Sequence, residues 1–344
     1  MAMSLSTEIT SLFNIRHPII LAGMNVAAGP DLAAAVTNAG GLGVIGGLGH
    51  TPKSLKQVIW IMKQQLTDES APFGVNLALP QVGGGARATN YDYTHGQLHE
   101  LLEVIIEERA ALFVSAAGVP PKDLIDKLHK ASILVMNMIG HPKHIPRALK
   151  QGVDIVCAQG GEGGGHTGDI PFSILIPAGQ VSINGEASLS CRCGGIYDGR
   201  GLAASLAFGA EAVWVGTRFV ASVEAGVTKR HKDAVVTANH GDTITTTIYT
   251  GRPLRVRRTP YVEDWETNRQ EEIKRLTSAG KIPHAVPLDE GPRTIASTYP
   301  LLMGAVAAVI DDVLPAKVII EQMVQDAVER LEASSLMVNL FSKL

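Results

Sequence analysis

Short apolar runs recur along the chain, and each is followed by a glycine or polar turn and then by a segment whose apolar residues have helical spacing. The runs lack the alternation of a half-exposed strand, which is typical of parallel strands buried on both faces. We expect strands at residues 18–22, 42–45, 73–77, 111–115, 133–138, 155–158 and 212–215, with a weaker one near 188–193. Between them we expect helices over residues 31–39, 51–66, 97–109, 122–130, 143–151 and 201–208.

This alternation of strands and helices predicts the α/β class and, within it, a (β/α)8 TIM barrel. Active sites of such barrels lie at the C-terminal ends of the strands, so the turns that follow the strands are where chemistry is expected. The main alternative is an open doubly wound sheet, which usually has fewer strands.

The pattern changes after Phe219, where residues 220–298 become richer in Thr, Arg, His and charge. Helical stretches are expected near residues 225–238 and 265–278. We predict a smaller, mostly helical lid domain over 220–298, inserted after the last strand of a barrel formed by 1–219 and 299–344. Pro315 stands at a good helix start, and one face of the helix after it carries Val318, Ile319, Met323, Ala327 and Leu331.

Composition narrows the class of protein. The chain has 344 residues, 45% of them hydrophobic and 18% charged, with a net charge of −3, which is typical of a soluble α/β enzyme. The charge favours neither nucleic acid nor an anionic membrane as a partner. The longest apolar stretch, residues 301–310, is too short to span a bilayer.

The three cysteines are too few for a disulfide scaffold and fit a reducing compartment. They are Cys157, Cys191 and Cys193. A structural zinc site needs a fourth ligand, which the sequence does not offer, so no metal is expected.

The first and last residues of the chain give different predictions about targeting signals. The first residues lack the basic and apolar segments of a signal peptide. The last three, Ser342-Lys343-Leu344, match the tripeptide that the peroxisomal import receptor binds. We therefore predict a peroxisomal location with that receptor as a partner, and a cytoplasmic location if the match is a coincidence of a solvated tail.

Glycine-dense turns follow the last expected strands. Residues 160–168 read Gly-Gly-Glu-Gly-Gly-Gly-His-Thr-Gly, residues 194–201 begin with two glycines, and Gly216 precedes Thr217. Glycine after a strand lets backbone N–H groups approach a ligand without a Cβ in the way. We predict that the amides of Gly194, Gly195, Gly216 and Thr217 bind a cofactor phosphate; the alternative is that these glycines only make tight turns.

His166 ends the first of these turns, in a stretch without apolar periodicity. The turn lacks the spacing of a dinucleotide fingerprint or a Walker loop. A histidine has a pKa near neutrality, which suits a general base or a donor to an anion. His166 is the candidate catalytic residue, and a solvated loop histidine is the alternative.

Several motifs, taken in series, resemble the nitronate monooxygenase family, formerly called 2-nitropropane dioxygenases. The resemblance covers residues 15–335 in order. The motifs are His-Pro-Ile-Ile-Leu-Ala-Gly-Met at 17–24, Ala-Gly-Gly-Leu-Gly-Val-Ile at 39–45, Gly-Val-Asn-Leu at 74–77, Ala-Gln-Gly at 158–160, Gly-Gly-His-Thr-Gly at 164–168, Gly-Gly-Ile-Tyr-Asp-Gly-Arg-Gly at 194–201 and Gly-Thr-Arg-Phe at 216–219. Residues 90–93 and 252–255 resemble fungal members.

The resemblance implies a (β/α)8 barrel that binds FMN without a covalent bond. It places the isoalloxazine and ribityl groups against Gly23, Met24, Asn76 and Gln159, and the phosphate against Gly195, Gly216 and Thr217. Ala22, Gly164, Gly165 and Gly194 complete the expected cofactor site.

The same resemblance implies oxidation of alkyl nitronates, such as propionate 3-nitronate, with O2 to a carbonyl compound and nitrite, through one-electron transfer to the flavin. His166 would remove the α-proton of a neutral nitroalkane, or orient a nitronate that is already an anion. Two alternatives are an NAD(P)H-dependent flavin reductase of enoyl thioesters or quinones, and a binding protein that has lost its flavin. A homodimer is left open.

Residues 178–193 depart from the family pattern. Ser188, Ser190 and Arg192 are poor residues for a strand buried on both faces. Either the seventh strand is rebuilt or this segment is an altered version of it, and the positions of Gly194 and Gly195 depend on the answer.

Other histidines and a run of arginines are further candidates for substrate contacts. His141 follows the strand at 133–138 and could touch substrate or cap a helix, whereas His17 is expected to be structural. A basic run could attract an anionic nitronate, although we favour solvation or pairing with Glu263, Asp264 and Glu266. That run is Arg252, Arg255, Arg257 and Arg258.

Overall fold

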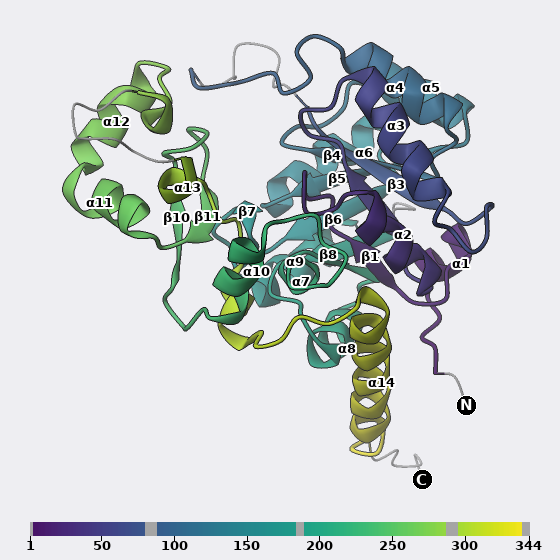
Figure 1. The fold of residues 1–344 in the computed structure, drawn as a ribbon. Coiled ribbons are helices and arrows are strands. Elements are labelled where there is room, and N and C mark those ends of the chain that lie inside the picture. Colours follow the sequence, from purple (N-terminus) through teal and green to yellow (C-terminus); the bar gives the residue numbers. More distant parts are fainter. Residues whose placement is uncertain (1–2, 80–87, 184–188, 287–294, 339–344) are drawn as a thin grey trace.

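Eight parallel strands surround a central core, with helices outside them (Figure 1). The computed structural model describes residues 3–79, 88–183, 189–286 and 295–338, so the predicted peroxisomal tripeptide Ser342-Lys343-Leu344 lies outside it. The strands are β1 (Ile19–Leu21), β2 (Gly43–Gly46), β3 (Phe73–Ala78), β4 (Leu112–Ala116), β5 (Leu134–Ile139), β6 (Ile155–Gln159), β8 (Leu189–Cys193) and β9 (Ala212–Val215). Each predicted strand is confirmed to within one residue at either end.

The sheet closes on itself, which confirms the barrel over the open sheet. Its order is β1-β9-β8-β6-β5-β4-β3-β2, and a parallel bridge between Ile20 and Leu42 joins the two ends. The amide of Leu21 donates to the carbonyl of Leu42 at 2.9 Å, and the amide of Leu42 donates to the carbonyl of Ile19 at 2.9 Å. No strand edge of the barrel is therefore left unpaired at this seam.

The outer helices follow the strands much as their spacing predicts. They are α2 (Pro30–Asn38), α3 (Pro52–Lys63), α4 (Leu98–Glu107), α5 (Lys122–Lys130), η1 (Pro142–His144), α6 (Ile145–Gln151), α7 (Phe172–Ile183) and α8 (Gly199–Ala207). The pattern missed α7, because its sequence is almost continuously apolar and contains Pro177.

Two layers of apolar side chains fill the barrel and cover its outside. The inner layer includes Leu42, Val114, Met136 and Trp214, whereas alternate residues on the same strands pack against the outer helices. The unpredicted helix α1 (Glu8–Phe13) adds Ile9 and Phe13 to the inner layer. Helix α1 therefore closes the N-terminal end of the barrel with apolar packing. The opposite end, at the C-terminal ends of the strands, is where the polar residues of an active site are expected.

The segment after β9 contains more strand than we predicted. It begins with α9 (Thr217–Val220) and continues through α10 (Lys229–Val236), β10 (Thr243–Thr246), β11 (Leu254–Arg257), α11 (Pro260–Asn268), α12 (Gln270–Ser278), η2 (Pro283–Ala285) and α13 (Ile295–Thr298). The single helix expected over 265–278 is two helices that meet at Arg269, whose φ of −129° is not helical. An apolar cluster around Trp265 gives this segment a core of its own, to one side of the barrel (Figure 1).

A small antiparallel sheet joins the segment 220–298, called the lid below after its predicted role, to the barrel. Its order is β10-β11-β7, and β7 (Gly165–His166) belongs to the loop that follows β6. The lid therefore shares a sheet with the loop that carries the candidate histidine.

The chain then returns to the barrel through η3 (Ala305–Val309) and α14 (Ala316–Ser335), which lies along α8 (Figure 1). Helix α14 begins directly after Pro315, as predicted, and buries Ile319, Met323 and Ala327. Val318 and Leu331, which we placed on the same face, are half-buried. Within the described residues, no helix combines the length and the apolar character needed to cross a bilayer.

His231 ties α10 to the returning chain and generates a pH prediction. Its Nε2 lies 2.9 Å from the carbonyl oxygen of Leu302, to which the neutral ring donates. Burial lowers the pKa of His231, although the bond to Leu302 acts in the opposite direction. Above pH 6.5 the ring is neutral in both the folded and the unfolded chain; below it, the unfolded chain takes up the proton first.

We therefore expect the free energy of unfolding to fall as the pH drops below about 6.5, and to fall less in His231→Gln, whose amide can still donate to Leu302. Urea titrations of both proteins at several pH values between 5 and 8 would measure this. Equal pH dependence in the two proteins would contradict the assignment.

Candidate active site

The floor of the barrel's C-terminal mouth is formed by residues at the ends of β1, β3 and β6. A Cβ on Gly23 would lie 2.3 Å from the Cβ of Asn76, so only glycine allows the first turn to pack this closely on β3. Asn76 is buried, and its Nδ2 donates to the carbonyl of Val114 at 3.1 Å. The inner layer of the barrel thus ends in a fixed amide side chain.

Gly216 brings β9 close to the same floor. A Cβ on Gly216 would contact the Sδ of Met24 at 3.4 Å and the Cβ of Ala22 at 3.5 Å. Helix α9 begins at Thr217, and the first amides of a helix have no partner within it. The sequence-predicted residues of β1 and β9 are therefore neighbours in the structure.

Thr217 is fixed by the chain that returns from the lid. Its Oγ1 accepts a hydrogen bond from the amide of Gly304 at 2.8 Å, and the residue is buried. A hydroxyl oxygen that accepts such a bond can still donate its own hydrogen. The predicted donor role of Thr217 is compatible with this geometry.

The seventh barrel strand is formed, although its sequence is unusual. β8 pairs in parallel with both β6 and β9, and Gln159 lies opposite Cys193 in the ladder. Residues 189–193 of the atypical segment 178–193 thus form a barrel strand, and residues 184–188 lie outside the part of the chain that the structure describes.

Gly194 and Gly195 follow β8 with φ values of +92° and +73°, a region that favours glycine. A Cβ on Gly194 would lie 2.9 Å from the carbonyl oxygen of Gly160. The turn after β8 is therefore next to the turn after β6.

The loop after β6 is held at its middle by Glu162. The carbonyl of Glu162 accepts from the amide of Ala305 at 2.9 Å, and its carboxylate accepts from the amide of Phe172 at 3.1 Å. A Cβ on Gly164 would lie 2.7 Å from the amide nitrogen of Gly304. The loop is thus packed between backbones, and Gln159 reaches the carbonyl of Gly164 at 3.4 Å.

Arg255 of the lid holds the same loop from the other side. Its guanidinium donates to the carbonyl of Gly161 through Nη2 at 3.0 Å and Nε at 3.2 Å. The pKa of Arg255 is lowered, because burial outweighs the opposite effect of the nearby Glu162. The guanidinium nevertheless remains charged at neutral pH.

His166 lies at the junction between this loop and the lid. It is exposed, and its Nε2 is 3.0 Å from the Oγ1 of Thr250. In the ladder His166 is opposite Leu254, and Gly165 is opposite Arg255. Because side chains alternate across a sheet, His166 and Arg255 project from opposite faces.

The Arg255 face borders a pocket of about 730 Å³. The pocket is also lined by Gly161, Glu162, Thr167, Gly168, Asp169, Pro171, Thr245, Pro253 and Ala305. His166 is not among the lining residues, so this hollow and the histidine belong to different faces of the small sheet.

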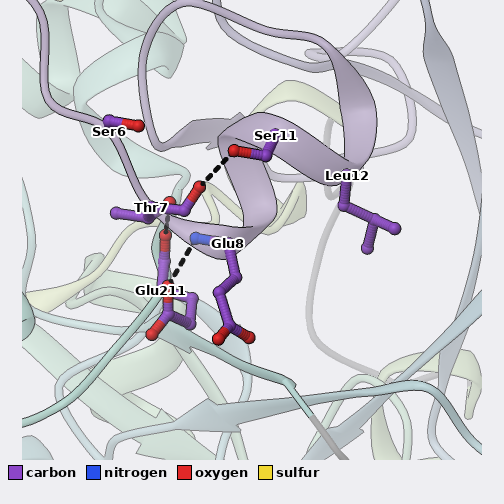
Figure 2. Close-up of a pocket in the computed structure, with 6 residues that line it drawn as sticks. All are labelled: Ser6, Thr7, Glu8, Ser11, Leu12 and Glu211. Atoms are coloured by element: carbon purple, nitrogen blue, oxygen red, sulfur yellow. Dashed lines mark hydrogen bonds between the residues drawn. The ribbon is translucent and has the colours of Figure 1, made fainter.

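A second hollow, of about 810 Å³, lies at the other end of the barrel (Figure 2). It is lined by the start of α1 and by Glu211, which accepts from the hydroxyl of Thr7 at 2.7 Å through its carbonyl. Glu211 directly precedes β9, so this hollow is at the N-terminal strand ends, where barrels of this class do not place their chemistry.

The predicted cofactor residues thus form one connected group at the C-terminal mouth. Ala22 and Met24 pack against Gly216, and Gly23 packs against Asn76. Thr217 and Gly164 both contact Gly304. Gly194 and Gly195 border the Gly160–Glu162 part of the loop. The functions assigned to these residues, and to His166, stay predictions.

Other candidate residues have structural roles. His141 accepts from the amide of Lys143 at 3.1 Å and caps η1, which supports the capping alternative. His17 is buried before β1, where burial lowers its pKa, and its Nδ1 has no hydrogen-bond partner in the described structure. Cys157 is buried inside the barrel.

No cluster of ligating side chains suited to a metal ion occurs among the described residues.

The basic run pairs only in part as we expected. Arg258 does pair with Glu263, but Arg257 pairs with Asp242, and Asp264 pairs with Arg269. The pair with Glu263 agrees with our expectation, and the partner that the structure gives Asp264, Arg269, lies just past the end of α11.

Sequence reasoning also missed Thr250, Gly304 and the loop contact of Arg255. Each lies far along the chain from the residue it contacts, and no local motif marks the pairing.

Comparison with known proteins identifies related chains. A family model described as nitronate monooxygenase matches residues 6–326. A Mycobacterium tuberculosis protein named (3aS,4S,5R,7aS)-5-hydroxy-7a-methyl-1-oxo-octahydro-1H-indene-4-carboxyl-CoA dehydrogenase is 32% identical, over 98% of this chain and 100% of that protein. A probable nitronate monooxygenase of Staphylococcus saprophyticus is 34% identical, over 74% and 79%.

Among solved structures, FabK from Thermotoga maritima superposes with a TM-score of 0.80 and is 32% identical, over 97% of this chain and 100% of that one. The closed barrel and its lid segment are therefore shared with a protein of related sequence.

Proposed function

The chain belongs to the nitronate monooxygenase family, a family of flavin-dependent oxidoreductases, and on that basis we propose that it oxidises alkyl nitronates with O2, using FMN. The observation that carries the proposal is the connected group of glycine turns at the barrel mouth, with His166 at its edge. The products would be a carbonyl compound and nitrite.

The mouth fits FMN in three respects. The turns at Gly194 and Gly216 offer backbone amides without a Cβ above them, which suits a phosphate. The floor of Met24, Asn76 and Gln159 combines an apolar side chain with amides, which suits a flat ring with polar edges. At Gly165, where φ is +70°, no atom lies within 4 Å of an added Cβ, so the backbone there has open space beside it.

Bound FMN would supply the redox chemistry, by accepting electrons from the nitronate and passing them to O2. The residues of the chain would bind and orient the reactants. His166 would donate a hydrogen bond to the anionic nitronate group, or accept the α-proton of a neutral nitroalkane at a ring nitrogen. Fixed loops on both sides of His166 would keep its ring in place without reorganisation.

A second candidate is a flavin enzyme that exchanges hydride between NAD(P)H and an enoyl thioester or quinone. The full-length similarity to a dehydrogenase whose name specifies a carboxyl-CoA compound favours it. Both candidates use the same mouth, so only the reactants distinguish them.

The peroxisomal import receptor stays a proposed partner through Ser342-Lys343-Leu344, and the homodimer stays an open proposal.

The first test is an absorption spectrum of the purified protein, followed by anaerobic propionate 3-nitronate in the same cuvette. We expect a flavin spectrum that changes on addition of the nitronate and does not change with NADPH. Flavin that ignores the nitronate but bleaches with NADPH would favour the second candidate. Protein without flavin, even after incubation with FMN, would contradict both and favour a binding protein.

Replacement of His166 tests its assigned role in the same assay. We expect His166→Ala to keep its flavin, because the ring of His166 is held by Thr250 of the lid, and to react with nitronate about 100-fold or more slowly, because a donor to the anionic group is lost. Stopped-flow spectroscopy would measure the rate, and His141→Ala is the matched control at another barrel loop. Unchanged reduction in His166→Ala would remove this residue from the mechanism.

Thr217 tests the phosphate site separately. Thr217→Val keeps the shape but removes the hydroxyl, and with it both the acceptor for the Gly304 amide and the predicted donor to the phosphate. We expect FMN to bind about tenfold or more weakly, because a hydrogen bond to a charged group contributes about 1.5–3 kcal/mol. Thr217→Ser, which keeps the hydroxyl, should bind FMN almost as tightly as the native chain. Titration of the flavin-free proteins with FMN would measure both, and equal affinities in all three would contradict the site.

A further inference from the structure

The ring of His166 is held by a residue of the lid that no motif identifies. Thr250 lies in the turn between β10 and β11, and its Oγ1 is 3.0 Å from the Nε2 of His166. The backbones are joined at the same place, because the amide of Thr167 donates to the carbonyl of Pro253 at 3.3 Å. His166 therefore meets the lid through both its side chain and its strand.

The other contacts of the Thr250 hydroxyl offer its hydrogen a carbonyl acceptor. The hydroxyl donates to the carbonyl of Arg252 at 3.3 Å and accepts from the amide of Arg252 at 3.3 Å. A hydroxyl has one hydrogen and two acceptor positions. If its hydrogen goes to the Arg252 carbonyl, the contact with His166 is satisfied only when Nε2 carries a proton and donates it.

The turn that presents Thr250 is itself fixed to the barrel. The amide of Gly251 donates to the carbonyl of Thr247 at 2.8 Å, and Gly251 has a φ of +67°. A Cβ on Gly251 would lie 2.2 Å from the Oγ1 of Thr89, so the turn packs directly against the chain that leads to α4.

Arg252 anchors the turn at a second point. Its guanidinium donates to the carbonyl of Ala117 at 3.2 Å and to the Oδ1 of Asn90 at 3.0 Å. Ala117 directly follows β4 and has a φ of +65°, a conformation that is uncommon for alanine. A strained residue at a barrel strand end thus presents a carbonyl to the lid, which is a feature of functional sites.

We propose that Thr250 is the positioning residue of His166, and that it holds the imidazole in the tautomer with the proton on Nε2. The unprotonated nitrogen is then Nδ1, which is the atom that accepts a proton from a neutral substrate. When the ring becomes charged, the Thr250 oxygen continues to accept from Nε2–H. The proposal rests on the proposed function only in placing His166 at the reacting site.

The tautomer can be measured without substrate or cofactor. In 15N-histidine-labelled protein above pH 8, nuclear magnetic resonance distinguishes a protonated ring nitrogen from an unprotonated one, and the spectrum of His166→Gln identifies the signals of His166. We expect Nε2 to be fully protonated in the native chain and in Thr250→Ser. In Thr250→Val we expect the mixture of tautomers of an unconstrained imidazole, in which Nε2–H predominates and a minor Nδ1–H population appears. A native His166 protonated on Nδ1, or a Thr250→Val spectrum identical to the native one, would overturn the proposal.

A kinetic comparison separates positioning from general damage. We expect Thr250→Val to react with a neutral nitroalkane, whose α-proton Nδ1 would accept, about 3- to 10-fold more slowly, the effect of one neutral hydrogen bond, with unchanged flavin content. Thr250→Ser should restore the rate. Thr267→Val makes the same chemical change on α11, where the hydroxyl donates to Glu263, and it should leave the rate unchanged.

The proposed function and the positioning of His166 by Thr250 can be contradicted separately. If the tautomer is as expected but no nitronate is oxidised, the proposed function is wrong and the positioning stands. If nitronate is oxidised but Thr250→Val changes neither the tautomer nor the rate, the positioning is wrong and the function stands.

Discussion

The mouth of the barrel depends on a contact between backbones that leaves no room for side chains. Gly164 and Gly304 approach so closely that a Cβ on Gly164 would lie 2.7 Å from the Gly304 nitrogen. The same glycine donates to the hydroxyl of Thr217, and the next amide donates to the carbonyl of Glu162. The loop after β6, the turn after β9 and the chain returning from the lid are therefore one packed unit, and each of the predicted functions requires that unit.

Residues of the lid make contacts that hold the residues of the candidate site. β11 pairs with β7, Arg255 holds the carbonyl of Gly161, and Thr250 contacts His166. A lid that only covered the mouth could be replaced without effect on the histidine. Here the environment of the histidine is determined by a hairpin 84 residues further along the chain, so changes in the lid are transmitted to the reacting group.

The barrel could be predicted from the sequence because its strands and helices are recognised from residues that are neighbours along the chain. Apolar runs without alternation marked the strands of the barrel other than β8, which was expected only weakly, and Pro315 marked the start of α14. The small sheet could not be predicted, because β7 has only two residues and its partner β11 is recognisable only by pairing. The glycines of the site were found from their position after strands, whereas Thr250 and Gly304 act through contacts between distant segments, for which a single sequence holds no periodic signal. Helix α7 was missed because a run that is apolar on all sides has no helical period.

The strand order also determines when the site can form during synthesis. β3 to β6 can each pair with the strand before them as they leave the ribosome, but β1 pairs with β9 and must wait for it. The loop after β6 waits still longer, because β11 and Ala305, which hold it, are made later. A nascent chain that stops before residue 305 would therefore carry the barrel strands without a fixed mouth. Any cofactor bound there is taken up by an almost finished polypeptide, and cofactor supply cannot guide the early steps of folding.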